Sequence, residues 1–557
     1  MKRSFFCKMI SVILALATGF CCCVFSEPVS VAAYDIPASI RVGLKVIEAA
    51  YAISSASGMT YGYTINNVYT ALETVVANEI IYIRQDAYFY NGTNLPTKYT
   101  SASSVPSGKN TYGPYRVQIG EAYASYEEVK AAANTLSTEL AQHCYPAYNG
   151  TAWMVYTGDY TSEEKATAGK DVLLAKNETL ACKIVKQNNT ALVLQDKAYK
   201  TLLFFCPGKD MKFTVKPLEA TLPLLKLGTQ QFRGYLEFRR FSDRDITVIN
   251  ILGFDEYLYG VLPTEVSAGW NLPEVFKAQA VSARNFAFIN YRSAKHPEYD
   301  FDVCSTSNCQ NYGGYSAEYK VTNEAVDATS GQLLLYDGKP ASIYYSASDG
   351  GYTEGTENVW SAVTPYYKAV KDPYDPKQYL LYSMTAAEAS ATLKAKGYNV
   401  GDLQSIAIKK RSSSGRALEM VVTGTVGSAT IKKNQTRGAF GLRSQLFSVR
   451  TDSVYTMLEG EWNNALVESL DGTKYSQAFI KASTFTLRVA PSDGIMAHND
   501  YYYETVTIKN QSDMIYFDVY GNGHGIGMSQ LGAKAMAQQG LTYIDIMNFY
   551  YPGTIVG

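Results

Sequence analysis

The stretch NLPEVFKAQAVSARNFAFINYRSAK, residues 271–295, predicts a long helix in the second half of the chain. Asn271 is a residue type that can cap a helix, and Pro273 fits the first helical turn. One apolar stripe at steps of four, three and four residues consists of Phe276, Ala280, Ala283 and Ala287. Such spacing is typical of a helix that packs on a neighbouring layer, and the small side chains permit close contact.

Two strands precede this helix. YLEFRR and ITVINIL, residues 235–240 and 246–252, alternate apolar and polar side chains as strands do. A sequence of strands followed by helices predicts an α+β domain rather than an alternating α/β fold.

Between the strands and the helix lies EYLYGVLPTEVSAGW, residues 256–270, whose carboxylate Glu265 has two interpretations. As a surface charge ahead of the helix it would say nothing about function. Held against an apolar wall, it could become a proton donor, because burial raises the pKa of a carboxyl group. The residues available for such a wall are Val261, Leu262, Val266 and Trp270.

Further polar candidates lie in or after this helix. Gln279 and Arg284 stand among apolar neighbours, where a solvated face is as good an explanation as a ligand-facing one. SIYYSASDGG, residues 342–351, places hydroxyls and two glycines after a strand, which lets backbone approach a ligand closely. His524 lies in the glycine-rich loop YGNGHGIGMSQ, which lacks the lysine that a phosphate-binding loop requires.

An internal repeat occupies the middle of the chain. Val117 and Gly120 recur 38 residues later as Val155 and Gly158, and a Ser-Glu-Glu pattern follows each copy. Alternating apolar residues lead to Gly, a serine can cap, and a helical stretch follows, so the unit is strand-turn-helix used twice. The capping serines are Ser125 and Ser162.

Composition limits the classes of function. The 557 residues indicate about three or four domains. The net charge of −1 and the absence of a long basic run argue against nucleic acid as a partner. The 46 tyrosines suit contact with sugar rings, although tyrosine-rich strands of an extracellular β protein explain them equally.

The N-terminus predicts export. Lys2, Arg3 and Lys8 precede an apolar run over residues 9–25, so residues 1–33 form a signal peptide or an uncleaved membrane anchor, and cleavage is favoured. The five later cysteines cannot all pair within the chain, because their number is odd. They are Cys144, Cys182, Cys206, Cys304 and Cys309.

The repeat resembles the sporulation-related repeat (SPOR) domain, over residues 113–180. That resemblance implies a small ferredoxin-like module of four strands that binds peptidoglycan glycan strands stripped of their peptides. Residues 34–112 before it form a segment of unreadable role that ends in the Ser/Pro/Gly-rich linker TKYTSASSVPSGKN.

The motifs DEYLYGVLPTEV, KAQAVSAR, SASDGG, GLRS and GHGIGMSQLGAKAMAQQG together resemble the family of stage II sporulation protein D and amidase enhancers. The resemblance assigns residues 181–557 to one domain with its core motifs in 232–557. It implies a lytic transglycosylase that cleaves peptide-stripped strands between N-acetylmuramic acid and N-acetylglucosamine, with Glu265 as the catalytic residue. The alternatives are an amidase enhancer, a protein that activates a cell-wall amidase, and a wall-binding protein without activity.

One carboxyl group can suffice for that reaction. A carboxylic acid protonates the leaving oxygen, and the substrate's own carbon-6 hydroxyl replaces the water that a hydrolase activates with a second carboxylate. The candidate substrate contacts, chosen as polar residues inside the family motifs, are Gln279, Arg284, Ser346, His524 and Gln530.

The loop DVCSTSNCQNY, residues 302–312, resembles a cysteine-rich loop in which some family members hold zinc. Asn308 stands where those members have a histidine, so we expect no metal, no cofactor and a local disulfide between Cys304 and Cys309. A zinc site that includes His296 is the alternative.

The whole chain is thus predicted to be a multidomain α+β protein with mixed and antiparallel sheets, located in the cell wall or anchored on the outer face of the cytoplasmic membrane. The expected partners are denuded glycan strands and a cell-wall amidase, with membrane contact only if the N-terminal segment stays uncleaved.

Overall fold

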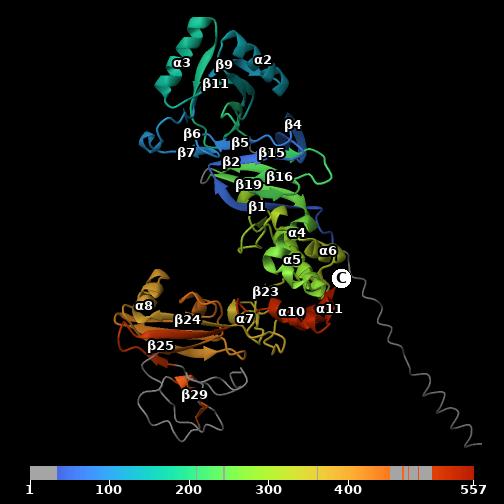
Figure 1. The fold of residues 1–557 in the computed structure, drawn as a ribbon, viewed down its shortest axis with the longest axis vertical. Coiled ribbons are helices and arrows are strands. Elements are labelled where there is room, and N and C mark those ends of the chain that lie inside the picture. Colours follow the sequence, from blue (N-terminus) through green and yellow to red (C-terminus); the bar gives the residue numbers. More distant parts are fainter. Residues whose placement is uncertain are drawn as a thin grey trace, which may run out of the picture.

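The computed structural model describes residues 34–208, 210–241, 245–360, 362–451 and 505–557, together with three short strands, β29 (Val467–Ser469), β30 (Lys474–Tyr475) and β31 (Leu487–Arg488). Figure 1 shows the repeat module with α2 and α3 at one end, two stacked sheets next to it, a helical layer in the middle and a further β-rich unit beyond. The predicted α+β, multidomain fold with mixed and antiparallel sheets is confirmed.

The repeat module has the predicted duplicated unit. Its elements are β9 (Tyr115–Tyr123), α2 (Tyr126–Glu139), β10 (Cys144–Tyr148), β11 (Trp153–Tyr160), α3 (Glu163–Lys176) and β12 (Cys182–Val185). The strand order β12-β9-β11-β10 is that of a split βαββαβ, or ferredoxin-like, module. Ser125 accepts a hydrogen bond from the Glu128 amide, and Ser162 from the Lys165 amide, so both serines cap their helices.

The backbone conformation explains why glycine recurs in both copies of the repeat. Gly120 and Gly158 have φ of +74° and +78° inside their strands. A side chain at either position would be strained, because L-residues avoid this region. The duplication therefore preserves a kink in each strand.

The module continues into a ten-stranded sheet of order β12-β9-β11-β10-β14-β13-β5-β2-β16-β17. The added strands are β14 (Thr201–Phe205), β13 (Leu192–Asp196), β5 (Ile81–Gln85), β2 (Ala50–Ser54), β16 (Leu225–Leu227) and β17 (Gln230–Phe232). Arg84 lies opposite Val193, so residues before the repeat pair with residues after it.

A seven-stranded sheet has the order β20-β1-β19-β18-β15-β3-β4. Its strands are β20 (Val303–Cys304), β1 (Ser39–Glu48), β19 (Ile246–Gly253), β18 (Tyr235–Arg240), β15 (Met211–Pro217), β3 (Met59–Ile65) and β4 (Val68–Val75). Val42 pairs with Asn250, a residue about 200 positions later in the chain. The segment 34–112, whose role the sequence left open, is therefore part of both sheets.

The linker-like residues 97–110 lie in a small three-stranded sheet or its connections. That sheet has the order β7-β6-β8, from β6 (Phe89–Asn91), β7 (Pro96–Lys98) and β8 (Thr111–Tyr112). Its Ser/Pro/Gly residues make the connection between β7 and β8, which includes one 3-10 turn at Ala102–Ser104.

Three helices, α4 (Phe254–Glu265), α5 (Pro273–Ser293) and α6 (Lys320–Ala328), form the helical layer. The stripe predicted on α5 is completely buried against the core that the sheets share, and its other side packs through Ala278 and Val281 on a second apolar cluster. The predicted cap at Asn271 was wrong. Asn271 is in the left-handed region after a short 3-10 turn, and Leu272 is the N-cap. Residues 254–265 form a helix of their own, because their apolar side chains recur at helical spacing.

The C-terminal residues return to the helical layer. The two-residue strands β23 (Tyr345–Ser346) and β34 (Met528–Ser529) pair in parallel, and α10 (Gln530–Gln538) and α11 (Tyr543–Tyr550) pack on α5. A small sheet of β21 (Leu334–Tyr336), β22 (Lys339–Pro340) and β35 (Ile555–Val556) lies near the C-terminus, and α7 (Thr356–Val359) follows β23.

Between β23 and β34 lies a unit with its own apolar core. It has the sheets β24-β33-β28 and β27-β26-β25-β32. Its elements are β24 (Tyr379–Thr385), α8 (Ala386–Ala395), β25 (Leu403–Arg411), β26 (Ala417–Gly424), β27 (Gly427–Lys432), α9 (Gln435–Gly438), β28 (Phe447–Thr451), β32 (Thr505–Thr507) and β33 (Met514–Tyr520).

The signal peptide or anchor predicted at residues 1–33 lies outside the described residues. Within the described ranges, no helix is both long enough and apolar enough to span a membrane.

Candidate active site

Glu265 is the last residue of α4 and is half-buried. Val261 and Leu262 are completely buried one turn earlier, Val266 is buried beside it, and Trp270 packs at the edge of the same cluster. The apolar wall that the sequence suggested is therefore present.

Burial raises the pKa of the Glu265 carboxyl to about 7, and a hydrogen bond from a backbone amide partly opposes the shift. That bond runs from the Asn311 N–H to Oε1, at 3.3 Å. Among the described residues, no charged side chain contributes to the shift. The position at the C-terminal end of a helix also disfavours a negative charge. The group is thus placed to hold a proton near neutral pH.

A hydrogen-bonded network lies beside this carboxyl group. The Tyr257 hydroxyl donates to Oε1 of Gln310 at 3.1 Å, and Nε2 of Gln310 donates to the Tyr345 hydroxyl oxygen at 3.0 Å. Burial raises the pKa of both tyrosines, and the Glu265 charge adds to the shift in each case, so both phenols lie near Glu265 and stay neutral. Gln310 and the adjacent Asn311 therefore connect α4, β23 and Glu265.

Gln279 and Gln530 join this network, as the sequence analysis predicted them to lie at one site. Nε2 of Gln530 donates to Oε1 of Gln279 at 3.4 Å, and the Gln279 side chain lies near the Tyr345 hydroxyl. Nε2 of Gln279 is buried and has no hydrogen-bond partner of normal geometry. A buried amide donor without a partner is costly, so this one is available to a ligand oxygen.

Ser346 and His524 lie together on the other side of β23. The Ser346 hydroxyl is buried without a partner, and Gly523 packs so closely on Ser346 that a Cβ there would come within 2.4 Å of the serine Cβ. The next residue, His524, contacts the Trp360 ring at a centroid distance of 5.3 Å.

His524 is a neutral imidazole. Burial, together with the charges of Arg437 and Arg416, lowers its pKa to about 3. Its Nδ1 accepts the Ile526 amide at 3.0 Å, which leaves the proton on Nε2. The side chain can donate a hydrogen bond, but it cannot serve as a cationic acid at neutral pH.

Arg284 is not part of this group. Its guanidinium is completely buried on another face of α5, where Nε donates to Asp255 at 3.0 Å. The remaining donors bind the carbonyl oxygens of Val326 and Gln332 and the Thr329 hydroxyl. Every nitrogen of this side chain is used inside the fold, which joins α4, α5 and α6.

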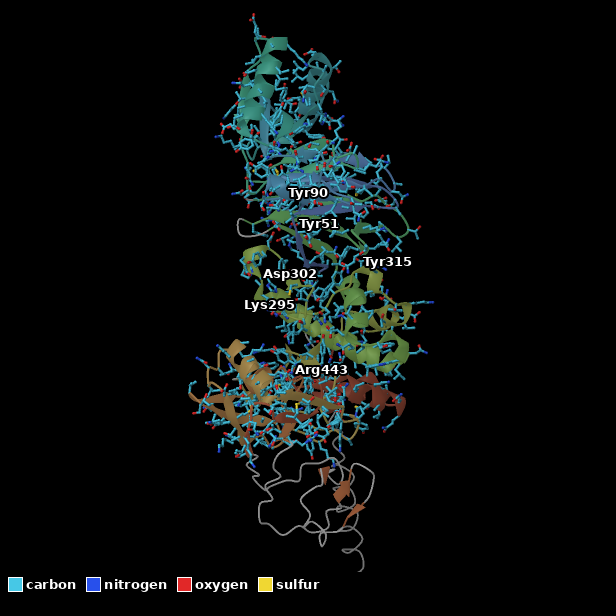
Figure 2. The ribbon with its side chains drawn as sticks, turned by 60° about the vertical axis from the view of Figure 1, so that its left-hand side comes forward. Tyr51, Tyr90, Lys295, Asp302, Tyr315 and Arg443 are labelled. Carbon is cyan, nitrogen blue, oxygen red and sulfur yellow. The ribbon has the colours of Figure 1, made fainter. Side chains whose placement is uncertain are left out.

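The cysteine loop corrects one expectation. Cys304 and Cys309 are free thiols, not a disulfide, and Nε2 of His296 lies 3.2 Å from the Cys309 sulfur. A hydrogen bond between the sulfurs lowers the pKa of Cys304 and raises that of Cys309. Lys295, labelled in Figure 2, donates to the Asn308 carbonyl oxygen at 2.5 Å and fixes the loop to the end of α5.

The side chains of His296, Cys304 and Cys309 supply part of a site for a soft metal ion. Their ligand atoms lie within 4.8 Å of one another, as three of the four ligands of a structural zinc site would. Asn308 does not supply the fourth, because its side-chain amide donates toward Cys304 at 3.8 Å.

A second cluster, of Asp349, Asp372 and Asp375, has carboxylate oxygens within 4.8 Å of one another and is buried. Asp375 accepts four hydrogen bonds, from the hydroxyls of Ser348 and Ser529 and the amides of Asp349 and Lys377, so its lone pairs are occupied. Burial and the neighbouring carboxylates raise the pKa of Asp349 well above its usual range. The cluster is a framework that holds β23 against β34.

The residues that hold Glu265 in place were not predicted from the sequence. Gln310 and Asn311 directly follow the second cysteine of the 302–312 loop, and Tyr345 directly precedes Ser346. The available signal was their position: Gln310 and Asn311 lie inside the family-like cysteine loop, and Tyr345 lies directly before the SASDGG motif. The hydrogen bonds among them depend on contacts between distant segments, which one sequence does not reveal.

Three family models match the chain. One described as "Stage II sporulation protein" matches residues 242–336, one described as "SPOR domain" matches residues 111–186, and a domain of unknown function matches residues 376–463. The first contains Glu265, and the third falls in the unit between β23 and β34.

Curated relatives include the amidase enhancer of Bacillus subtilis, 29% identical over 471 residues, which cover 82% of this chain and 59% of the relative. The chain thus spans less than two thirds of that protein's length. An uncharacterized protein of Brachyspira hyodysenteriae is 30% identical over 58% of this chain and 71% of its own length. Stage II sporulation protein D of Bacillus subtilis is 27% identical over 66% of this chain and 88% of its own.

Proposed function

We propose that this chain, a member of the stage II sporulation protein D and amidase-enhancer family, is an exported peptidoglycan lytic transglycosylase that acts on peptide-stripped strands in the cell wall. The observation that carries the proposal is Glu265, a half-buried carboxyl group whose pKa is raised to about 7 by burial. A general acid works best when its pKa lies near the working pH.

The reaction needs one such group. Protonated Glu265 gives its proton to the oxygen between N-acetylmuramic acid and N-acetylglucosamine, and the bond from carbon 1 to that oxygen breaks. The carbon-6 hydroxyl of the muramic acid residue then bonds to carbon 1, and its proton returns to the Glu265 carboxylate. The product has a 1,6-anhydro end, and no water is consumed.

The surroundings support this role. The Asn311 amide holds one carboxyl oxygen, so the other can face a substrate. Nε2 of Gln279 and the Ser346 hydroxyl are buried donors that have no hydrogen-bond partner of normal geometry among the described residues, which suits contact with sugar hydroxyl or acetamido oxygens. A lytic transglycosylase needs no second carboxylate as nucleophile or base, and among the described residues no charged side chain shifts the Glu265 pKa.

The repeat module, at residues 113–180 by the sequence analysis, would hold the same strand. When the module holds a glycan strand, the local concentration of that strand at the catalytic domain rises, so two moderate affinities combine. The domain boundaries and the substrate contacts Gln279, Ser346, His524 and Gln530 are part of this proposal. Arg284 is left out, since its donors are used within the fold.

The second candidate is an amidase enhancer, favoured by the relative of that name that covers 82% of this chain. In that case the chain would bind denuded or intact strands and activate an amidase without cleaving glycan itself.

Mass spectrometry of peptide-stripped strands incubated with the exported chain separates the two. The transglycosylase produces anhydro-ended fragments. An enhancer produces none, but releases stem peptides faster when an amidase and intact peptidoglycan are added.

A further inference from the structure

A cavity of about 350 Å³ lies where the repeat module meets the seven-stranded sheet. Tyr123, Tyr148 and Trp153 line it from the ends of β9, β10 and β11, and Tyr63 and Met211 line it from β3 and β15. Among the described residues, no charged side chain lines it. It is far from Glu265 in the fold, because α4 lies on the other side of the sheets (Figure 1).

The aromatic rings of this cavity are held in place from behind. Tyr148 packs against Trp153 and Phe205 at centroid distances of 5.1 and 5.7 Å, and Tyr63 stacks on Phe205 at 6.2 Å. The three tyrosines are nevertheless only half-buried. Rings fixed before a ligand arrives lose little side-chain entropy on binding.

Within the described residues, the hydroxyls of Tyr63, Tyr123 and Tyr148 have no hydrogen-bond partner. A partly buried tyrosine usually finds one. Flat apolar faces beside unused hydroxyls match a sugar ring, which has an apolar face of C–H groups and a rim of hydroxyls.

The face of the repeat-module sheet that lies opposite α2 and α3 is closed to such a ligand. Val117 and Val155 point toward α2 and α3, so Arg116 and Tyr156, next to them in the strands, point to the opposite face. Both are buried there, and the Arg116 guanidinium is paired with Asp86 at 2.8 Å. A glycan can therefore contact the module at the ends of β9, β10 and β11, where the cavity lies, but not on this face of its sheet.

We propose that this cavity is a glycan-binding site that takes a neutral N-acetylhexosamine ring, formed jointly by the repeat module and the seven-stranded sheet. The proposal rests on the proposed function, since it identifies where the strand is held. The lining residues that the structure describes are uncharged, which favours the N-acetylglucosamine residue of a strand over its neighbour, whose lactyl group is a carboxylate after the peptide is removed. Charged stem peptides likewise find no opposite charge among these residues.

The test is isothermal titration calorimetry of the full exported chain, carrying Glu265→Gln, with a tetramer of N-acetylglucosamine. The tetramer contains no muramic acid and is not a substrate. Tyr123→Ala should weaken binding about tenfold, as truncation of an aromatic anchor does, and Tyr63→Phe should weaken it less. Tyr319→Ala, which removes a tyrosine that is 58% exposed on the helical layer, is the matched control and should bind as the parent does.

Thermal unfolding curves of each variant establish that the fold is kept. Absence of tetramer binding, or equal binding by Tyr123→Ala and the control, would overturn the assignment of this cavity. Cleavage is measured separately with Glu265 intact. If the chain produces anhydro-ended fragments but Tyr123→Ala binds the tetramer as the parent does, only the assignment of this cavity is contradicted. If Tyr123→Ala weakens tetramer binding as predicted but no anhydro-ended fragments appear, only the enzymatic function is contradicted.

Discussion

At the scale of the residue, Glu265 is in a place that disfavours its own ionisation. The sequence left open that it is a stabilising charge ahead of the helix at 271–295. In the structure it ends α4 instead, where the helix dipole opposes a negative charge, and burial raises its pKa to about 7. The helix-cap explanation therefore loses its physical basis.

This pKa makes a prediction for stability. The folded state binds the Glu265 proton more tightly than the unfolded chain does, so this group makes stability fall as pH rises from about 4.5 to about 7. Glu265→Gln removes that loss. We expect the variant to melt at a higher temperature than wild type at pH 8, and the difference to shrink at pH 5, in thermal scans across pH.

The control is Glu178→Gln, an exposed glutamate in a turn, which should leave the melting temperature unchanged at both pH values. A Glu265→Gln variant that melts below wild type at pH 8 would mean that the ionised carboxylate stabilises the fold, contrary to its assigned environment.

The aspartate cluster gives a second prediction at this scale. Asp375→Asn should lower the free energy of unfolding by about 2 to 3 kcal/mol, because an amide NH₂ cannot accept from the donors that now meet one of the carboxylate oxygens. Asp349→Asn is the matched comparison. Asp349 favours its neutral form and one of its oxygens has no partner, so asparagine should cost about 1 kcal/mol or less.

Urea unfolding of the two variants measures the difference. Equal losses would show that Asp349 is ionised in the folded chain, and the description of the cluster would have to change.

At the scale of the element, α5 is the helix on which the site depends. Its stripe of small residues and its proline at the first turn were readable from spacing, and both are confirmed. The partners of its polar residues were not readable. Gln279 and Arg284 are both polar and both completely buried, yet Gln279 faces the network at Tyr345 and Arg284 holds α4 and α6 together. Which face a neighbouring helix covers depends on packing between segments, not on local spacing.

Arg284→Met tests whether Arg284 has a structural role rather than a ligand-binding one. It removes the cationic partner of Asp255 and the side-chain donors to the carbonyl oxygens of Val326 and Gln332, so the free energy of unfolding should fall by about 3 to 5 kcal/mol. Lys277→Met on the same helix is the control. Its ion pair with Glu274 is partly exposed, and its loss should cost about 1 kcal/mol or less.

Chemical unfolding reports the stability of both variants, and binding of denuded strands is measured below the unfolding transition. If Arg284→Met kept its stability and lost strand binding, Arg284 would be a ligand contact, as the sequence first suggested.

At the scale of the whole molecule, the repeat module is built into a larger sheet. β10 pairs with β14, and residues on both sides of the module share the sheets, as Arg84 and Val193 do. The sequence indicated the duplicated unit from its serines and glycines, since these act within a few residues. It could not indicate that residues 34–91 pair with residues 192–253, because strand pairing over such separations leaves no local pattern.

The cavity at Tyr123 and the carboxyl group at Glu265 thus belong to one continuous framework of two sheets and a helical layer. The unit between β23 and β34 leaves this framework intact, because the two strands still pair across it.

The most direct test of the central claim compares wild type with Glu265→Gln on peptide-stripped strands by mass spectrometry, with strand affinity measured in parallel. Glutamine keeps the shape of the side chain but has no proton to give, so anhydro-ended fragments should fall by about a hundredfold to ten-thousandfold while strand affinity stays near that of wild type. Equal amounts of anhydro-ended fragments from both proteins would contradict the assignment of Glu265 as the general acid.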